Sequence, residues 1–101
     1  MAKKTIIYWR DIPSQVVAQR GRKREKAHLS SRFQEAIDRA AMRAGKGGSE
    51  AYIAEWRRET TVFTESADLK AIAESEAERI ENSYSDERLV ELIRSHGLAG
   101  E

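Results

Sequence analysis

The sequence is constrained most by an apolar stripe that runs through residues 29–44. Its members are spaced three and four residues apart, as on the buried face of an α-helix; they are Leu29, Phe33, Ala36, Ile37, Ala40, Ala41 and Ala44. Ser30 or Ser31 is placed to cap the first turn, and Gly45 is placed to end the helix in the left-handed conformation. The pattern therefore predicts a long amphipathic helix that packs Phe33 and Ile37 against a sheet.

Segments on both sides of this helix favour β-structure. Residues 5–10 are β-branched and aromatic, and residues 15–19 follow a turn at Pro13, so an antiparallel hairpin is expected. Residues 20–26 either extend the second strand or form a solvated loop. The segment 51–58 is ambiguous, because Tyr52 and Trp56 share a face both in a helix and in a strand. We favour a third strand there, since a hairpin alone is only marginally stable.

Two further helices are expected in the C-terminal part. A stripe from Leu69 to Tyr84 predicts the first, which starts at residues 66–68 and has an acidic outer face, and Ser85 caps the second. The length fits a single domain over residues 1–101, with a core of about residues 4–95 and a short flexible C-terminal tail. The predicted fold is α+β, a small three-stranded antiparallel sheet with three helices packed on one face, in the order ββαβαα.

The composition excludes several classes of chemistry. Without Cys, the chain has no disulfide, no thiolate nucleophile and no cysteine-ligated metal site. Its two histidines, His28 and His96, stand in no metal-ligand pattern, and residues 45–49 lack the spacing of a phosphate-binding loop. No apolar run approaches the roughly 20 residues of a membrane span. We therefore expect a cytoplasmic protein without enzymatic activity, cofactor or metal.

The net charge of +1 conceals two halves of opposite sign. Residues 1–58 contain 14 Lys and Arg against 6 Asp and Glu, whereas residues 59–101 contain 4 against 11. Two arrangements compete. Either the acidic helices fold back over the basic part, which we favour in so small a chain, or a basic face stays open for an anionic partner.

Most of the candidate interaction residues are basic; the set is Arg10, Asp11, Arg20, Arg22, Lys23, Arg24, Lys26, Arg57 and Arg58. The run from Arg20 to Lys26 has the charge to contact phosphates. The aromatic residues Tyr8, Trp9, Tyr52 and Trp56 would stack on bases if they faced outward, but we favour a place for them in the core, with Trp9 and Trp56 largely buried. Arg10 and Asp11, beside Pro13, are either a brace for the turn, which we favour, or an interaction site.

Residues 8–16, which contain the string Tyr-Trp-Arg-Asp-Ile-Pro, resemble the opening of a small bacterial domain family named for virulence factors. The likeness continues through residues 31–38 and 52–56 and covers roughly Lys4 to Ile93. The family has no established reaction or catalytic residues to carry over. Its longer members join this domain to one that resembles iron–sulfur scaffold proteins and to helical repeats. The resemblance therefore implies an accessory role in metalloprotein or cofactor assembly.

Three functions are compatible with the sequence. We favour a small accessory or adaptor protein that binds an unidentified protein partner and is itself a monomer or a weak homodimer. The alternative is a weak nucleic-acid-binding module that uses the run Arg20 to Lys26. The third is a small enzyme whose acid and base come from Arg10, Asp11 and their neighbours.

Overall fold

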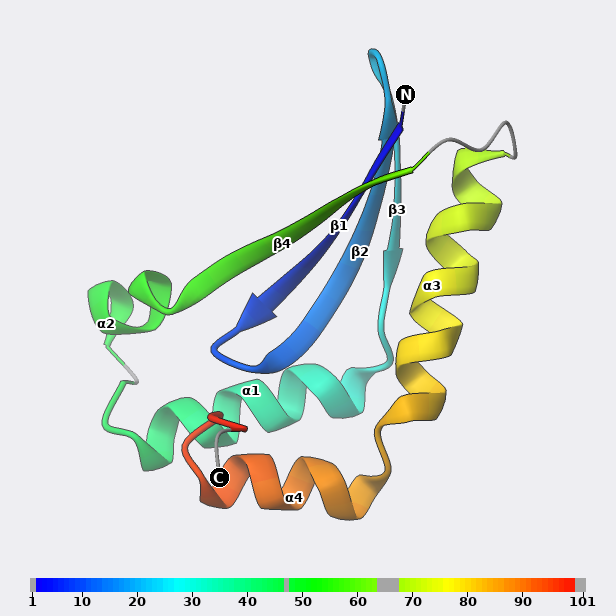
Figure 1. Cartoon of the computed structure of the whole chain (residues 1–101). Coiled ribbons are helices and arrows are strands. Elements are labelled where there is room, and N and C mark those ends of the chain that lie inside the picture. Colours follow the sequence, from blue (N-terminus) through cyan, green and yellow to red (C-terminus); the bar gives the residue numbers. More distant parts are fainter. Residues whose placement is uncertain (1, 47, 64–67, 100–101) are drawn as a thin grey trace.

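The chain forms one twisted antiparallel sheet with helices behind it and at one end (Figure 1). The computed structural model describes residues 2–46, 48–63 and 68–99. In this part of the chain the strands are β1 (Ala2–Trp9), β2 (Ile12–Arg20), β3 (Lys23–His28) and β4 (Trp56–Phe63). The helices are α1 (Ser31–Arg43), α2 (Ser49–Ala54), α3 (Leu69–Ser83) and α4 (Asp86–Arg94).

Strand β1 lies inside the sheet and pairs with a neighbour on each side. The strand order is β3-β2-β1-β4, and each neighbouring pair is antiparallel. β1 and β2 form the predicted antiparallel hairpin, but the turn predicted at Pro13 is wrong: the chain turns at Arg10 and Asp11, and Pro13 lies within β2, where it pairs with Tyr8. β2 and β3 form a second hairpin, whose turn has Gly21 at a φ of +61°, a conformation that glycine adopts without steric cost. The N-terminal third of the chain is thus a three-stranded meander, and β4 joins it from far along the sequence.

The described part of the sheet has four strands, so the predicted three-stranded sheet is wrong in this respect. The additional strand is β3, where we expected a loop or an extension of the second strand. Ala27 is its one apolar residue in the sequence Lys-Arg-Glu-Lys-Ala-His, so β3 has no alternation of apolar and polar side chains. Its backbone pairs with β2 from Gln15 and His28 to Arg20 and Lys23, and this pairing defines the strand.

The segment 51–58 is divided between a helix and a strand, so the strand predicted there is wrong for its first half. Helix α2 ends at Ala54 and β4 begins at Trp56, which gives the described chain four helices in place of the predicted three. Glu50 lies in the first turn of α2, where a carboxylate stabilises the helix dipole. The rings of Tyr52 and Trp56 do contact each other, at 5.8 Å between centroids, although the two residues belong to different elements.

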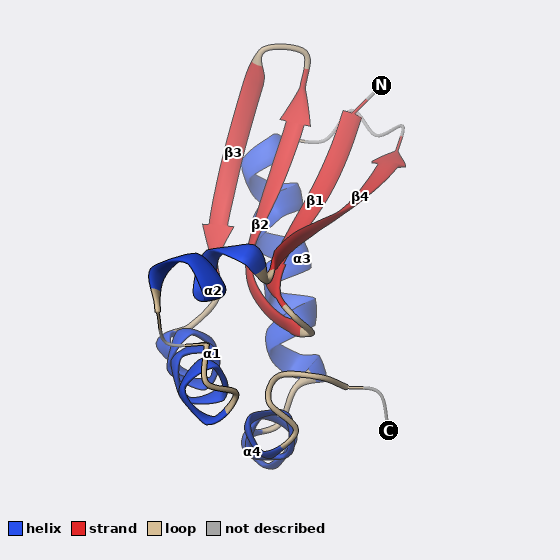
Figure 2. Cartoon of the chain, turned by 90° about the vertical axis from the view of Figure 1, so that its left-hand side faces the viewer, coloured by secondary structure: helices blue, strands red, loops and turns tan. Residues whose placement is uncertain are grey.

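The helices cover one face and one end of the sheet. α3 lies against β2 and β3, while α1 and α4 pack on each other below the turn between β1 and β2 (Figures 1 and 2). The prediction that all helices share one face is therefore wrong. Phe33 and Ile37 are buried as predicted, and Trp9 is 0% exposed, whereas Trp56 is only half-buried against the core.

Some of the helix caps predicted from the sequence are present and others are not. Ser85 caps α4 as predicted, since its Oγ accepts a hydrogen bond from the backbone N–H of Arg88 at 3.0 Å. Gly45 follows α1 with a φ of +72°, also as predicted. Ser30 precedes α1, but its hydroxyl donates to Glu81 of α3 at 3.1 Å and does not cap its own helix. Residues 66–67, where we expected the next helix to start, lie outside the described residues.

Candidate functional site

The two faces of the sheet differ in what covers them. Successive side chains of a strand point to opposite faces, so the register assigns every second residue to the face that α3 does not cover. Alternation also puts Trp9 and Trp56 on this side, but Tyr52 of α2 contacts both of them. The rest of the surface, called the open face below, consists of Lys3, Thr5, Ile7, Gln15, Val17, Gln19, Arg24, Lys26, His28, Arg58, Thr60 and Val62. In Figure 2 it is turned toward the viewer, with α3 behind the sheet and α2 in front of the lower ends of the strands.

The open face is basic. Its cations come from three strands and are all exposed; they are Lys3, Arg24, Lys26 and Arg58. No Asp or Glu lies on this face within the described strands, because Glu25 and Glu59 alternate to the other side. Cations without interspersed carboxylates create a positive potential that attracts anionic partners. The structure thus contains the open basic face that was the second of the two expected arrangements.

The acidic helix α3 lies behind the sheet and compensates charge there. Glu76 forms ion pairs with Arg79 of the same helix and with Lys4 of β1, the latter at 3.2 Å, and these hydrogen bonds lower the pKa of its carboxyl. Burial raises the pKa of the Glu81 carboxyl, but hydrogen bonds from Ser30 and Arg32 more than offset this effect, so the pKa lies below its ordinary value. The basic N-terminal half is therefore neutralised on one face of the sheet and left positive on the other.

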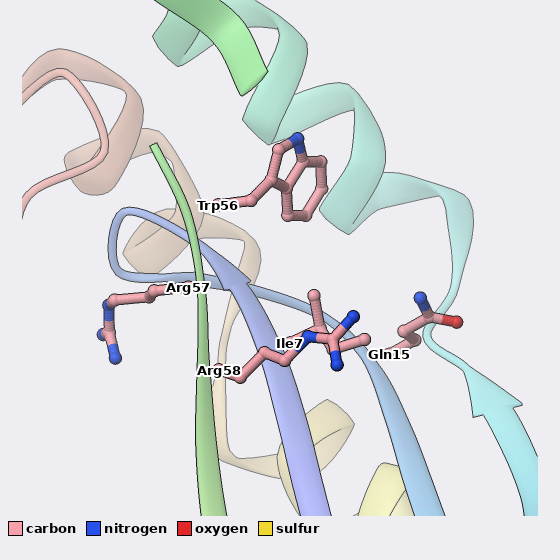
Figure 3. A pocket seen from close by; sticks show the side chains of 5 residues that line it. All are labelled: Ile7, Gln15, Trp56, Arg57 and Arg58. Carbon is pink, nitrogen blue, oxygen red and sulfur yellow. The ribbon is translucent and has the colours of Figure 1, made fainter. Parts of the chain in front are cut away.

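A cavity of about 300 Å³ lies at the lower end of the open face, next to α2 (Figure 3). It is lined by Ile7, Gln15, Trp56, Arg57 and Arg58. In Figure 3 the side chain of Arg58 extends on the same side of the strands as Ile7, Gln15 and Trp56, whereas that of Arg57 points the other way. The Oε1 atom of Gln15 is buried and has no hydrogen-bond partner in the described part of the chain. Apolar walls with a guanidinium at the rim suit a side chain that ends in a negative group.

Arg10 and Asp11 lie outside the open face and connect the β1–β2 turn to the rest of the molecule. Arg10 donates a hydrogen bond to the carbonyl of His96 at 2.8 Å and forms an ion pair with Glu55 at 3.3 Å. Asp11 accepts a hydrogen bond from the backbone N–H of Ala99 at 2.7 Å. These contacts attach the turn to α2 and to the residues after α4. A role of either residue in partner binding stays a prediction.

Arg57 completes this connection from β4. Its guanidinium forms an ion pair with Asp11 at 2.8 Å and another with Glu59, and it lies 4.3 Å above the ring of Tyr8. Its Nε also donates to the carbonyl of Arg10 at 2.7 Å. The N–H of Ala99 and the guanidinium of Arg57 together lower the pKa of the Asp11 carboxyl. Arg57 therefore has partners within the fold, whereas its neighbour Arg58 is exposed and forms no ion pair with another described residue.

The β2–β3 hairpin divides the basic run between two faces. Arg20 and Lys23 face each other on the side that α3 covers, and Arg22 lies in the turn. Arg24 and Lys26 lie on the open face, where register brings them beside residues that the sequence did not single out, namely Lys3, Gln15 and His28. The signal for this division was present in β3, because Arg24, Lys26 and His28 are every second residue.

The described residues contain no group of three or more His, Cys, Asp or Glu side chains that could hold a metal ion. Their helices also include none with both the length and the apolar character to cross a membrane.

Comparison with known proteins identifies the family. A family described as Virulence factor matches residues 7–93, which is most of the chain. The chain belongs to the virulence factor family. The resemblance carried by the Tyr-Trp-Arg-Asp-Ile-Pro string is thereby confirmed. No curated protein and no solved structure matches the chain. In this virulence factor domain, the matched residues include the cavity, the Arg10–Asp11 turn and most of the open face, whereas Lys3 precedes them.

Proposed function

We propose that this virulence factor domain is a small, non-enzymatic accessory or adaptor protein that binds a protein partner through its open face. One observation carries the proposal: exposed cations from β1, β3 and β4 share a face of the sheet on which the described strands place no carboxylate. Rows of like charge are unfavourable unless solvent or a partner of opposite charge compensates them. An acidic partner supplies that compensation.

The shape of the surface favours an extended acidic segment as the ligand. Val62 is 52% exposed beside Lys3 at one end of the open face, and Ile7 lines the cavity beside Arg58 near the other end. Apolar contacts are therefore available next to the cations at both ends. Arg58 stands at the cavity and is placed to anchor one carboxylate, while Arg24 and Lys26 would contact others along the segment. Such an arrangement combines charge-based steering with one anchoring pocket.

The same proposal includes a cytoplasmic location and a monomer or weak homodimer as the free state. The link to metalloprotein or cofactor assembly depends on the family resemblance alone, and the chain itself has no Cys to carry a cluster. Catalysis by Arg10 and Asp11 is disfavoured, because both side chains are held in ion pairs. The lowered pKa of Asp11 also leaves its carboxyl ionised at neutral pH, which makes it a poor proton donor.

A weak nucleic-acid-binding module is the second candidate, and one observation favours it. The acidic helix α3 lies on the opposite face of the sheet, so its carboxylates do not line the basic surface. The aromatic residues argue against it. Trp9 stacks on Tyr52 at 5.9 Å, and Tyr52 contacts Trp56 at 5.8 Å, so these rings pack mainly on one another and do not form a row of exposed platforms on which successive bases could stack.

Co-purification with matched charge variants tests the adaptor proposal. The full chain carries a tag and is compared with a triple variant of the open face, Arg24→Ala, Lys26→Ala and Arg58→Ala. The control triple variant removes the same charge elsewhere, through Arg22→Ala, Lys23→Ala and Lys70→Ala, at exposed positions off this face. We expect a protein partner at stoichiometric amount with the unchanged chain and the control, and its loss with the open-face variant. Retention by both triple variants would contradict the proposal.

Titration with labelled single-stranded and duplex oligonucleotides tests the alternative. We expect no dissociation constant below about 10 µM at about 150 mM salt, because the cations are few and lack stacking partners. Submicromolar binding that weakens steeply with added salt and is lost in the open-face variant would instead favour the nucleic-acid module.

A further inference from the structure

A second surface stands apart from the open face, in the groove between α1 and α4. Met42 and Val90 are 74% and 43% exposed there, although both are apolar, and the half-buried Ile93 lies between them and the core. The groove has a volume of about 420 Å³ and is lined by Arg39, Met42, Arg43, Val90, Ile93 and Arg94. An exposed apolar patch that is bordered by polar or charged residues often marks a site of interaction with another protein.

The rim of this groove is basic and unpaired. Arg39, Arg43 and Arg94 form no ion pair with any described residue. Arg43 and Arg94 lie in the last turns of their helices, where a cation interacts favourably with the helix dipole, but Arg39 lies a turn earlier. Helical spacing places Glu35, Asp38, Asp86 and Glu87 one turn before residues that line the groove, but none of these carboxylates lines it. The apolar part of the groove is thus bordered by cations.

A second copy of the chain does not fit this groove. A two-fold contact would place the three arginines of one molecule opposite the same arginines of the other, which is repulsive. The outer face of α3 supplies acidic groups, but its exposed positions contain no large apolar side chain; they are Lys70, Ala71, Glu74, Ser75, Glu78, Arg79, Asn82 and Ser83. The apolar floor would then remain uncovered.

We propose that the groove between α1 and α4 binds an amphipathic helix of a partner protein, with apolar residues against Met42, Val90 and Ile93 and acidic residues against the three arginines. Helices commonly bind in this way, through apolar anchors spaced three and four residues apart. The lining residues span 39–43 of α1 and 90–94 of α4, about one turn of each helix, so a bound helix would contact the groove through about one to two of its turns. This site is independent of the open face, since it uses other elements and other cations.

Fluorescence anisotropy with a designed probe tests this site on the full chain. The probe is a labelled helical peptide of about 14 residues with Leu on one face and Glu on the other, and the control peptide has Lys in place of Glu. We expect binding of the acidic peptide alone. Met42→Glu should weaken it by about tenfold or more, because it places a carboxylate in the apolar floor. Ile53→Glu is the matched control, since it puts the same charge on an exposed apolar position of α2, and should have little effect.

Four results would overturn the proposal: equal binding of both peptides, equal weakening by both variants, no binding at about 1 mM peptide, or a homodimer in sedimentation velocity that Met42→Glu dissociates. Because Met42 and Ile53 are both exposed, loss of folding does not confound the comparison. The open-face triple variant should bind the acidic peptide like the unchanged chain, so this site and the proposed adaptor surface can fail separately.

Discussion

Trp9 contacts parts of the molecule that lie far from it in the sequence. Its Nε1 donates to the carbonyl of Tyr52 at 2.8 Å, and its ring stacks on the Tyr52 ring. Gly97, after α4, comes so close that a Cβ there would lie 3.0 Å from the Trp9 ring. In the sheet, Trp9 pairs with Ile12 and Trp56. One side chain thus joins the sheet, α2 and the end of α4.

Trp9→Ala should lower the free energy of unfolding by about 3–5 kcal/mol, because it leaves a large cavity and removes the bond to Tyr52. Urea unfolding followed by far-ultraviolet circular dichroism measures this change. Trp56→Ala serves as the comparison and should cost less, since Trp56 is only half-buried. Equal losses in the two variants would show that Trp9 has no special place in the core.

Asp11→Asn should lower the free energy of unfolding at pH 7 by about 1 kcal/mol, because the ion pair with Arg57 is lost while Asn still accepts from Ala99. The pKa of Asp11 is lowered in the folded chain, so its contribution is present above the unfolded-state pKa and disappears as the pH falls through the folded value. The difference between the two proteins should therefore shrink below about pH 4. Urea titrations at pH 7 and pH 3 measure the free energy of unfolding of both proteins. The same difference at both pH values would show that the ionised Asp11 carboxylate is not its cause.

At the scale of elements, the loops that follow β2 and α4 depend on left-handed backbone. Gly21 in the β2–β3 turn and Gly97 after α4 have φ values of +61° and +85°. They differ in surroundings: a Cβ on Gly21 would meet no atom within 4 Å, whereas one on Gly97 would press on Trp9 and Arg10. The first glycine is therefore needed for backbone conformation alone, and the second for conformation and space.

Gly21→Ala should cost about 1 kcal/mol of stability, from left-handed backbone strain alone. Gly97→Ala should cost more, because the same strain is joined by displacement of the buried Trp9 ring. Thermal unfolding of both variants measures the order of the effects. The interpretation fails if Gly97→Ala proves the milder change.

At the scale of the whole molecule, the two faces of the sheet differ in charge: acidic side chains of α3 pair with cations on one face, and the cations on the other face are exposed. The acidic α3 forms ion pairs with Lys4 and Arg32 from the basic half, and these contacts hold α3 to β1 and α1. On the other face, α2 is the one described helix, and it lies only over the lower ends of the strands (Figure 2), so the cations of β1 and β3 face solvent there. The same sequence asymmetry therefore supports folding on one face of the sheet and supplies the cations of the proposed binding surface on the other.

Acid should destabilise the whole fold through its paired carboxylates. The pKa values of Asp11, Glu55, Glu76 and Glu81 are all lowered by hydrogen bonds from cationic or backbone donors. Each group stabilises the fold above its unfolded-state pKa, and this stabilisation is lost as the pH falls through the lower folded value. The thermal midpoint should thus stay nearly level from pH 7 to about pH 5 and decline below that. A midpoint that rises on acidification would contradict these ion pairs.

The sequence by itself determined the elements whose signal is local. The apolar stripes of α1, α3 and α4 and the β1–β2 hairpin repeat within a few residues, so helix and strand periodicity predicted them. Ser85 and Gly45 were predictable for the same reason, because each acts on the backbone next to it. The string around Arg10 and Asp11 identified the family, although its contacts with His96 and Ala99 could not be predicted.

The tertiary structure decided the features that depend on strand pairing, both between neighbours in the chain such as β2 and β3 and between distant segments such as β1 and β4. β3 exists because β2 offers it hydrogen bonds, and β4 begins at Trp56 because β1 pairs with it as far as Trp9. The open face has the same origin: Lys3, Arg24, Lys26 and Arg58 come from three strands, and only register puts them on one face. A polar strand such as β3 has no alternation of apolar and polar side chains, so the sequence alone does not reveal that it is a strand or which register it takes.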